Sequence, residues 1–215
     1  MGGMIAYATA VHFTACLLET PQICGENKTK IILGGVRAET AHARFYQPAV
    51  ALGRLAGRVA RLSKGAAVTG TGTLLQEDGR LLVLPQDISH IEPDASRLET
   101  DTRGGVLLRG AVMDIRTRGM LLHDPRVQKL EDGSRVANVS LGLTPYKEEQ
   151  TENRVPLIPI ELAFYEELAG QVEGLERRRY VAVSGQLQRR RLGDGFVDRI
   201  KVKHLEKLHP TRAML

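Results

Sequence analysis

The sequence predicts an all-β protein with short helices, built as two tandem five-stranded barrels. Three observations lead to this prediction. A twenty-residue stretch recurs at an offset of 113 residues, period-two alternation of apolar residues marks several strands, and one short segment of helical spacing lies in each copy. The length of 215 residues also fits two compact units.

The repeat aligns without gaps. LAGRVARLSKGAAVTGTGTL, beginning at Leu55, superimposes on LAGQVEGLERRRYVAVSGQL, beginning at Leu168. Such a spacing indicates duplicated domains, because solenoid units run to about 20–50 residues. The identical positions are Leu55, Ala56, Gly57, Val59, Leu62, Val68, Gly72 and Leu74, which recur as Leu168, Ala169, Gly170, Val172, Leu175, Val181, Gly185 and Leu187.

In the first copy, the apolar stretch 4–18 is interpreted as a strand, because MGG supplies no cationic region for a signal peptide. The apolar spacing over 52–62 predicts a short amphipathic helix. A strand follows that contains TGTGT. Its glycines are expected to permit a bend in a barrel, and they do not precede a helix as in a phosphate-binding loop.

In the second copy, three strands are expected in GVLLRGAVMDI, SRVANVSLGL and NRVPLIPIEL, with a turn at Asp132-Gly133. The helix follows over 168–175. The next strand alternates, with Val181, Val183, Gly185 and Leu187 on one face. After the turn LGDG, a last strand places Ile200 and Val202 opposite Arg199, Lys201 and Lys203.

Three strands, a helix and a closing hairpin form the element order of the five-stranded OB barrel. We therefore expect an N-terminal OB domain over 1–93, a linker over 94–104, a C-terminal OB domain over 105–208 and a short tail over 209–215. The linker is expected because its residues are polar and show no periodicity.

SRVANVSLGL, LAGQV, YVAVSGQLQRR and the turn region DPRVQKLEDGSRV resemble, in the same order, segments of bacterial single-stranded-DNA-binding proteins. The resemblance covers residues 104–208 well and 28–92 more faintly. It implies binding of single-stranded DNA with little sequence preference, in replication, repair or recombination. It also implies a homodimer that presents four OB folds.

Binding of a single strand requires cations along the backbone and flat rings on which bases stack. The hairpin that closes the second copy carries Arg189, Arg190, Arg191, Arg199, Lys201 and Lys203 against Asp194 and Asp198. Cations that contact phosphates release counterions and give affinity with little sequence preference. The expected phosphate contacts are Arg109, Arg116, Arg118, Lys147, Arg154, Arg190, Arg199, Lys201 and Lys203. The alternative is a solvated hairpin that is basic for solubility and edge protection.

Aromatic residues are scarce, at 4% with no Trp. The resemblance places stacking positions at Tyr46 and near Tyr146, where Lys147 occupies the family position itself, and a further one at Tyr165. Each tyrosine could instead cap a barrel end, with its ring in the core. We expect binding that depends more on charge, and therefore on salt, than is usual in the family.

Other features limit the alternatives. The net charge of +5 lies mostly in residues 101–215, so the second half is the expected electrostatic face. Cys16, Cys24 and His12 are too few for a zinc site, and no metal, cofactor or catalytic motif is expected. We expect a cytoplasmic, nucleoid-associated protein without a membrane segment, and HLEKLHPTRAML lacks the acidic tail with which the family recruits enzymes. A protein–protein scaffold in a repair or replication assembly is the alternative function.

Overall fold

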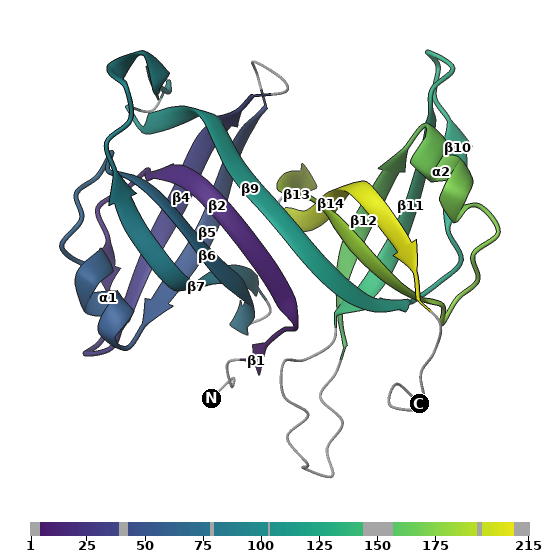
Figure 1. Cartoon of the computed structure of the whole chain (residues 1–215), viewed down its shortest axis with the longest axis horizontal. Helices are drawn as coiled ribbons and strands as arrows, with labels where there is room; N and C mark the ends of the chain where they lie inside the picture. The colour runs from purple at the N-terminus through teal and green to yellow at the C-terminus, as the bar shows by residue number, and fades with distance from the viewer. Residues whose placement is uncertain are drawn as a thin grey trace, which may run out of the picture. The chain divides into compact units, whose positions relative to one another are not determined.

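The computed structural model describes residues 5–38, 43–77, 80–102, 104–143, 157–192 and 195–208. The chain forms two compact units. One consists of Met1–Ala6 and Ala10–Asp114, and the other of Tyr7–Thr9 and Ile115–Leu215. Strands dominate both units, and each holds one short α-helix (Figure 1). The expected all-β class with short helices is confirmed.

The first unit closes five strands into a ring. Its antiparallel pairs are β2–β4, β4–β5, β6–β7 and β2–β6, and β5 pairs with β7 in parallel. Its elements are β1 (Ile5–Ala6), β2 (Thr9–Leu17), β3 (Gln22–Ile23), β4 (Lys28–Arg37), β5 (Arg44–Leu52), α1 (Arg54–Val59), β6 (Ala67–Glu77), β7 (Arg80–Ile91), η1 (Ala95–Arg97), β8 (Leu98–Thr100) and the first part of β9 (Val106–Leu121).

The second unit repeats this order. β11 pairs with β9 and β12, β12 pairs in parallel with β14, β14 pairs with β13, and β13 returns to β9. This is the strand order of the OB barrel, with the helix between the third and fourth strands. Its further elements are β10 (Arg126–Lys129), β11 (Arg135–Leu143), β12 (Ile158–Tyr165), α2 (Glu167–Val172), β13 (Tyr180–Leu192) and β14 (Gly195–Lys207).

The internal repeat is visible in the helices and in the cores. Each helix has six residues and buries an alanine and a valine at matching places, Ala56 and Val59 in α1 and Ala169 and Val172 in α2. Fully buried side chains fill each barrel, with Phe13, Leu33 and Leu74 in the first unit and Leu141, Leu143 and Phe164 in the second. Burial of each such side chain contributes about 1.5–3 kcal/mol.

A β-bulge lies at the same place in both copies. The register shifts between Thr71 and Gly72 in the β6–β7 hairpin, and between Ser184 and Gly185 in the β13–β14 hairpin. A Cβ at Gly72 would lie 2.4 Å from the carbonyl oxygen of Leu84. Only glycine allows so close an approach of two strands, which supports the interpretation that these glycines permit the bend.

The segment 94–104, expected as a linker, is built into the first unit. The Asp94 carboxylate accepts a hydrogen bond from the Ser96 amide at the start of η1. β8 then pairs antiparallel with β9, Leu98 opposite Leu108 and Thr100 opposite Val106. The division between the units falls inside β9, between Asp114 and Ile115.

Candidate nucleic-acid interface

The outer face of β14 carries the cations that the sequence places there. Ile200 and Val202 are buried in the second barrel, and the alternation of the strand turns Arg199 and Lys201 to the opposite side. Lys203 is exposed and is the extra residue of the bulge, because the register passes from Val202–Gly185 to His204–Ser184. Three positive charges therefore lie along one strand of the second unit.

Neighbouring strands add an aromatic ring and polar groups to this face. The Lys201 ammonium lies 5.5 Å from the centroid of the Tyr165 ring, at the end of β12. The Arg199 guanidinium donates a hydrogen bond of 2.9 Å from Nε to the side-chain oxygen of Gln188. Glu161 is the cross-strand partner of Arg199 and is the acidic residue in this arrangement. We call Tyr165, Arg199, Lys201 and Lys203 the β14 face.

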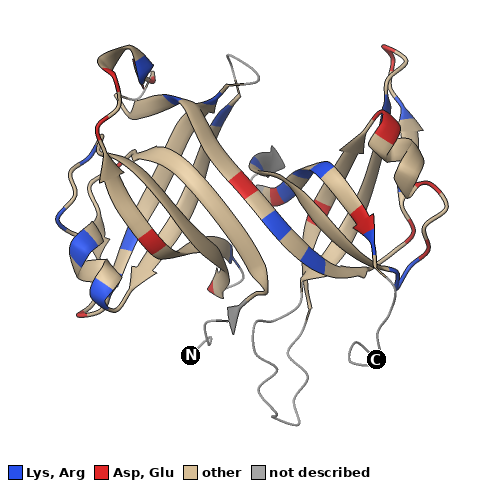
Figure 2. Cartoon of the chain, viewed as in Figure 1, with Lys and Arg blue, Asp and Glu red and all other residues tan. Residues whose placement is uncertain are grey.

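The second-unit part of β9 also exposes two arginines. Arg116 and Arg118 are exposed, while Ile115 before them and Thr117 between them are buried. Figure 2 shows basic positions as separate blue segments along β9. Neither Arg116 nor Arg118 forms an ion pair or a side-chain hydrogen bond with any residue that the structure describes. Both side chains are therefore available to an anionic ligand.

The positive charge of Arg189 is not available in the same way. Its guanidinium donates two hydrogen bonds of 2.8 Å to the Asp198 carboxylate, and both side chains are largely buried. Arg189 continues the inward alternation of Val181, Val183 and Leu187 along β13. This alternation is visible in the sequence and predicts an inward Arg189. One of the six cations of the hairpin is thus neutralised within the barrel end.

A polar pocket of about 430 Å³ adjoins Glu161 and was not expected from the sequence. His123 lies on its wall and accepts the backbone N–H of Ser140 at Nε2, at 3.1 Å. Its Nδ1 must then carry the proton and donate to the Asp124 carbonyl, at 3.0 Å. The lining residues are His123, Arg126, Gln128, Asn138, Val139, Ser140 and Glu161. Side chains with several donors and acceptors could bind base edges or sugars.

Several expected residues cannot be placed. Tyr146, Lys147 and Arg154 lie outside the described residues, and Arg190 belongs to β13 but its side chain is not described. The structure therefore leaves their expected roles as predictions.

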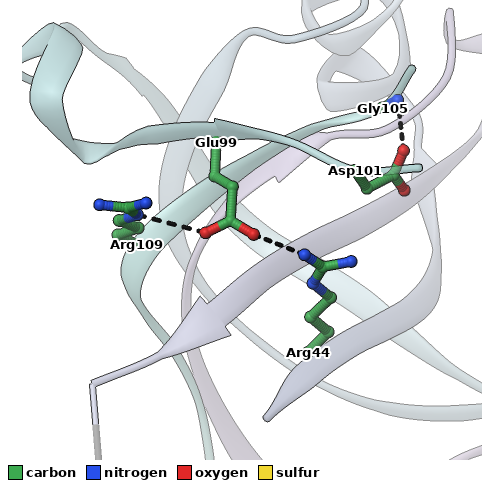
Figure 3. A network of polar contacts seen from close by, with 5 residues as sticks. All are labelled: Arg44, Glu99, Asp101, Gly105 and Arg109. Atoms are coloured by element: carbon green, nitrogen blue, oxygen red, sulfur yellow. Dashed lines mark hydrogen bonds and ion pairs between the residues drawn. The ribbon is translucent and has the colours of Figure 1, made fainter. Parts of the chain in front are cut away.

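Arg109 and Tyr46 belong to the first unit. The sequence grouped Arg109 with the second barrel, but the structure places it in the first-unit part of β9, where its Nε lies 3.2 Å from Glu99. Glu99 also contacts Arg44, as Figure 3 shows. Tyr46, on β5, is 41% exposed.

Where the second unit has the β14 face, the first unit has a mostly buried apolar cluster. Leu52 occupies the position of Tyr165 in the repeat. The parallel pair Ala49–Val83 corresponds to Leu162–Ile200, so Leu82 and Leu84 occupy the positions of Arg199 and Lys201. These three leucines pack in one apolar cluster, which also contains Val50 and Leu75. These three positions therefore carry no cation, while Lys30 and Arg80 line the pocket beside Leu82.

The two cysteines show no sign of a site. Cys16 is buried, and burial raises the pKa of its thiol to about 11, so it is protonated at neutral pH. Cys24 is exposed. Among the residues that the structure describes, no three His, Cys, Asp or Glu side chains group as metal ligands would.

The fold defines an OB protein with two units in tandem, the second of which carries a basic outer face. Among solved structures, the chain is similar to the wild-type single-stranded DNA binding protein from Thermus aquaticus, with a TM-score of 0.71 and 21% identity over 96% of this chain and 94% of that one. A deletion variant of the same Thermus aquaticus protein gives a TM-score of 0.70 and 20% identity, over 96% of this chain and 97% of that one.

These likenesses confirm the expected fold, since both tandem units are covered. No family model matches the chain, and a search of curated proteins also found no match. Within the described residues, neither α-helix is long and apolar enough to cross a membrane.

Proposed function

We propose that this protein binds single-stranded DNA with little sequence preference, mainly through its second OB unit, and so protects or presents the strand in replication, repair or recombination. The observation that carries the proposal is the β14 face, where three cations and a tyrosine gather on the outside of one barrel. The fold shared with the Thermus aquaticus protein supports it.

Electrostatic attraction provides most of the affinity in this proposal. Arg199, Lys201 and Lys203 contact successive phosphates, and Arg116 and Arg118 extend the basic surface along β9. Each phosphate contact releases counterions, so affinity falls steeply with salt and depends little on sequence. Lysine and arginine do not distinguish bases when they contact only phosphates.

The ring of Tyr165 can stack a base, but it already contacts Lys201 in the free protein. The ring faces the Lys201 ammonium, an interaction of about 0.5–1 kcal/mol at a partly exposed site. A base can stack on the ring when Lys201 moves to a phosphate, so the two contacts exchange rather than add. This exchange keeps the stacking contribution small and is consistent with binding that depends mainly on charge.

Titration of fluorescent oligo-dT at two salt concentrations tests the proposal. We expect micromolar or tighter binding at low salt and a large loss of affinity at the higher concentration. If no micromolar binding is found even at low salt, the proposal is wrong and the scaffold function remains.

A protein–protein scaffold is the second candidate. A surface pocket of about 490 Å³ on the first unit favours it. Its wall combines apolar with oppositely charged side chains, namely Ile31, Ile32, Pro48, Ala49 and Leu82 with Glu19, Lys30, Glu77 and Arg80. Such a mixed lining is typical of protein contacts. A non-enzymatic, nucleoid-associated protein in the cytoplasm agrees with either function.

A further inference from the structure

One carboxylate lies between two arginines in the first unit. The Glu99 oxygens lie 2.6 Å from Nη2 of Arg44 and 3.2 Å from Nε of Arg109 (Figure 3). The two arginines come from β5 and β9, and both are cross-strand partners of Val36 on β4. The three strands therefore hold the two guanidinium groups on either side of the same point.

A short hairpin places Glu99 at that point. β8 has three residues, and it is joined to β9 by a turn in which the Asp101 carboxylate accepts the Gly105 amide at 2.7 Å. Arg97 donates two hydrogen bonds to the carbonyl oxygen of Arg109, at 3.2 and 3.3 Å. These few contacts hold the carboxylate in place, and none of them buries a large apolar side chain.

Tyr46 lies beside Arg44. It is two residues from Arg44 on β5, so both side chains lie on the same face of the strand, and it is 41% exposed. The pKa of Arg44 is raised, first by its hydrogen bond to Glu99 and to a smaller extent by the neighbouring Tyr46. An exposed ring next to a guanidinium is an arrangement that binds one nucleotide, with the base on the ring and the phosphate on the guanidinium.

We propose that Arg44 and Arg109 form a phosphate site with Tyr46 as its base platform, and that Glu99 occupies this site as an internal competitor of the DNA backbone. The inference rests on the proposed function, and it adds a second binding site and its control. A carboxylate and a phosphate oxygen pair accept the same guanidinium donors, so one replaces the other without loss of hydrogen bonds.

Because Glu99 occupies the site, the first unit binds DNA weakly until a phosphate replaces the carboxylate. The ion pairs are exposed, and exposed pairs contribute little to stability, so β8 can release Glu99 at small cost. The pKa of Glu99 is lowered, first by Arg44 and then by Arg109, so the carboxylate is charged at neutral pH and competes with phosphate. Because both units belong to one chain, a strand bound to the second unit is tethered to the first, which raises the effective concentration of phosphate for the first unit.

Glu99→Gln tests the inference, with Glu77→Gln as its matched control. Glu77 also lies between two cations of the first unit, Lys28 and Lys30, so both variants remove one negative charge from a similar arrangement. Each variant is titrated with oligo-dT at several salt concentrations, in the native chain and in a chain with R199A/K201A/K203A, which removes the cations of the β14 face.

We expect Glu99→Gln to tighten binding at low salt at least about threefold. The slope of log K against log salt should also steepen by about 0.7–1.4, which corresponds to one or two added phosphate contacts. Adding R44A/R109A to the Glu99→Gln chain should abolish the gain in affinity. Glu77→Gln should not reproduce that gain.

Equal affinity of Glu99→Gln and the native chain, or an equal gain in Glu77→Gln, would overturn the inference. If the native chain binds and only the Glu99 effect is absent, the inference alone fails. If no variant binds at low salt, the proposed function fails with it.

Discussion

The side chains of Arg189 and Arg199 show how the position of a single residue decides which charge can reach a phosphate. Arg189 points toward the barrel interior, where Asp198 neutralises it through two hydrogen bonds. Arg199, on the partner strand, has the opposite orientation and contacts the neutral Gln188. The same residue type is structural in one position and available for binding in the other. Net charge alone therefore overestimates the binding surface.

Tyr165 can be tested at this scale. Replacement by Ala removes the ring that faces Lys201, and replacement by Phe retains it. Because a stacked base contributes about 1–3 kcal/mol and displaces a Lys201 contact of about 0.5–1 kcal/mol, we expect Tyr165→Ala to weaken oligo-dT binding by about two- to tenfold. Tyr165→Phe should bind as the native chain does. A loss in both variants would assign the contribution to the hydroxyl, and a loss in neither would leave the ring a packing group only.

Glu99 makes the stability of the protein sensitive to acid. Its pKa is lowered in the folded state, first by Arg44 and then by Arg109. A lowered pKa means that the folded state favours the charged form, so the stabilisation is present above the ordinary pKa of 4.5 and is lost as the pH falls through the folded value. Urea unfolding of the native chain and of Glu99→Gln should differ at pH 6 and converge toward pH 3. A difference that stays constant over this range would contradict the ion pairs.

At the scale of elements, the bulge in each closing hairpin and the close packing of β4 against β9 set the positions of the charged strands. Gly35 lies opposite Leu108 in the parallel β4–β9 pair of the first unit. A Cβ on Gly35 would lie 2.1 Å from the Cβ of Ala111 and 3.2 Å from the carbonyl oxygen of Leu108. This close approach places Arg109 across β4 from Arg44.

Gly35→Ala should therefore destabilise the protein and separate the two arginines. We expect a loss of about 1–3 kcal/mol in the free energy of unfolding, as for other overpacked sites. Gly57→Ala is the control, because a Cβ there has nothing within 4 Å and alanine favours the α1 helix by about 0.5–1 kcal/mol. Equal effects of the two substitutions in chemical denaturation would show that β4 and β9 are not closely packed.

The elements that the sequence predicts correctly are those with a local signal. The helices follow from apolar spacing at Ala56 and Val59 and at their repeats, and β14 follows from the alternation around Ile200. β8 carries no such signal. Leu98 is 39% exposed, and the strand forms only because β9 pairs with it, which no local pattern encodes.

The candidate site was predicted in part for the same reason. Alternation was sufficient to place Arg116, Arg118, Arg199 and Lys201 on outer faces. The contact of Glu99 with Arg44 joins residues 55 positions apart, and the pocket at His123 joins three strands. Such contacts depend on tertiary structure. The inward alternation along β13, by contrast, extends to Arg189 and is a local pattern that the sequence contains.

At the scale of the whole molecule, duplication has produced two barrels with different outer faces. The second unit has Tyr165, Arg199 and Lys201 where the first has Leu52, Leu82 and Leu84. The second copy thus carries cations where the first copy has leucines of a mostly buried apolar cluster. This difference contributes to the concentration of net charge in the second half of the chain.

We predict a homodimer, as the resemblance implies. Light scattering after size exclusion should give twice the chain mass of 23.6 kDa. A monomer in the native chain at micromolar concentration would contradict the dimer.

The central claim is that the β14 face binds the phosphates of a single strand. Its most direct test is the slope of log K against log salt for oligo-dT, in the native chain and in R199A/K201A/K203A. The control is R54A/R61A/K64A, which removes three exposed charges from the first unit. At about 0.7 per phosphate contact, the β14 variant should lower the slope by up to about 2 and weaken binding, while the control should change neither. An unchanged slope in the β14 variant, or the same change in both variants, would contradict the account.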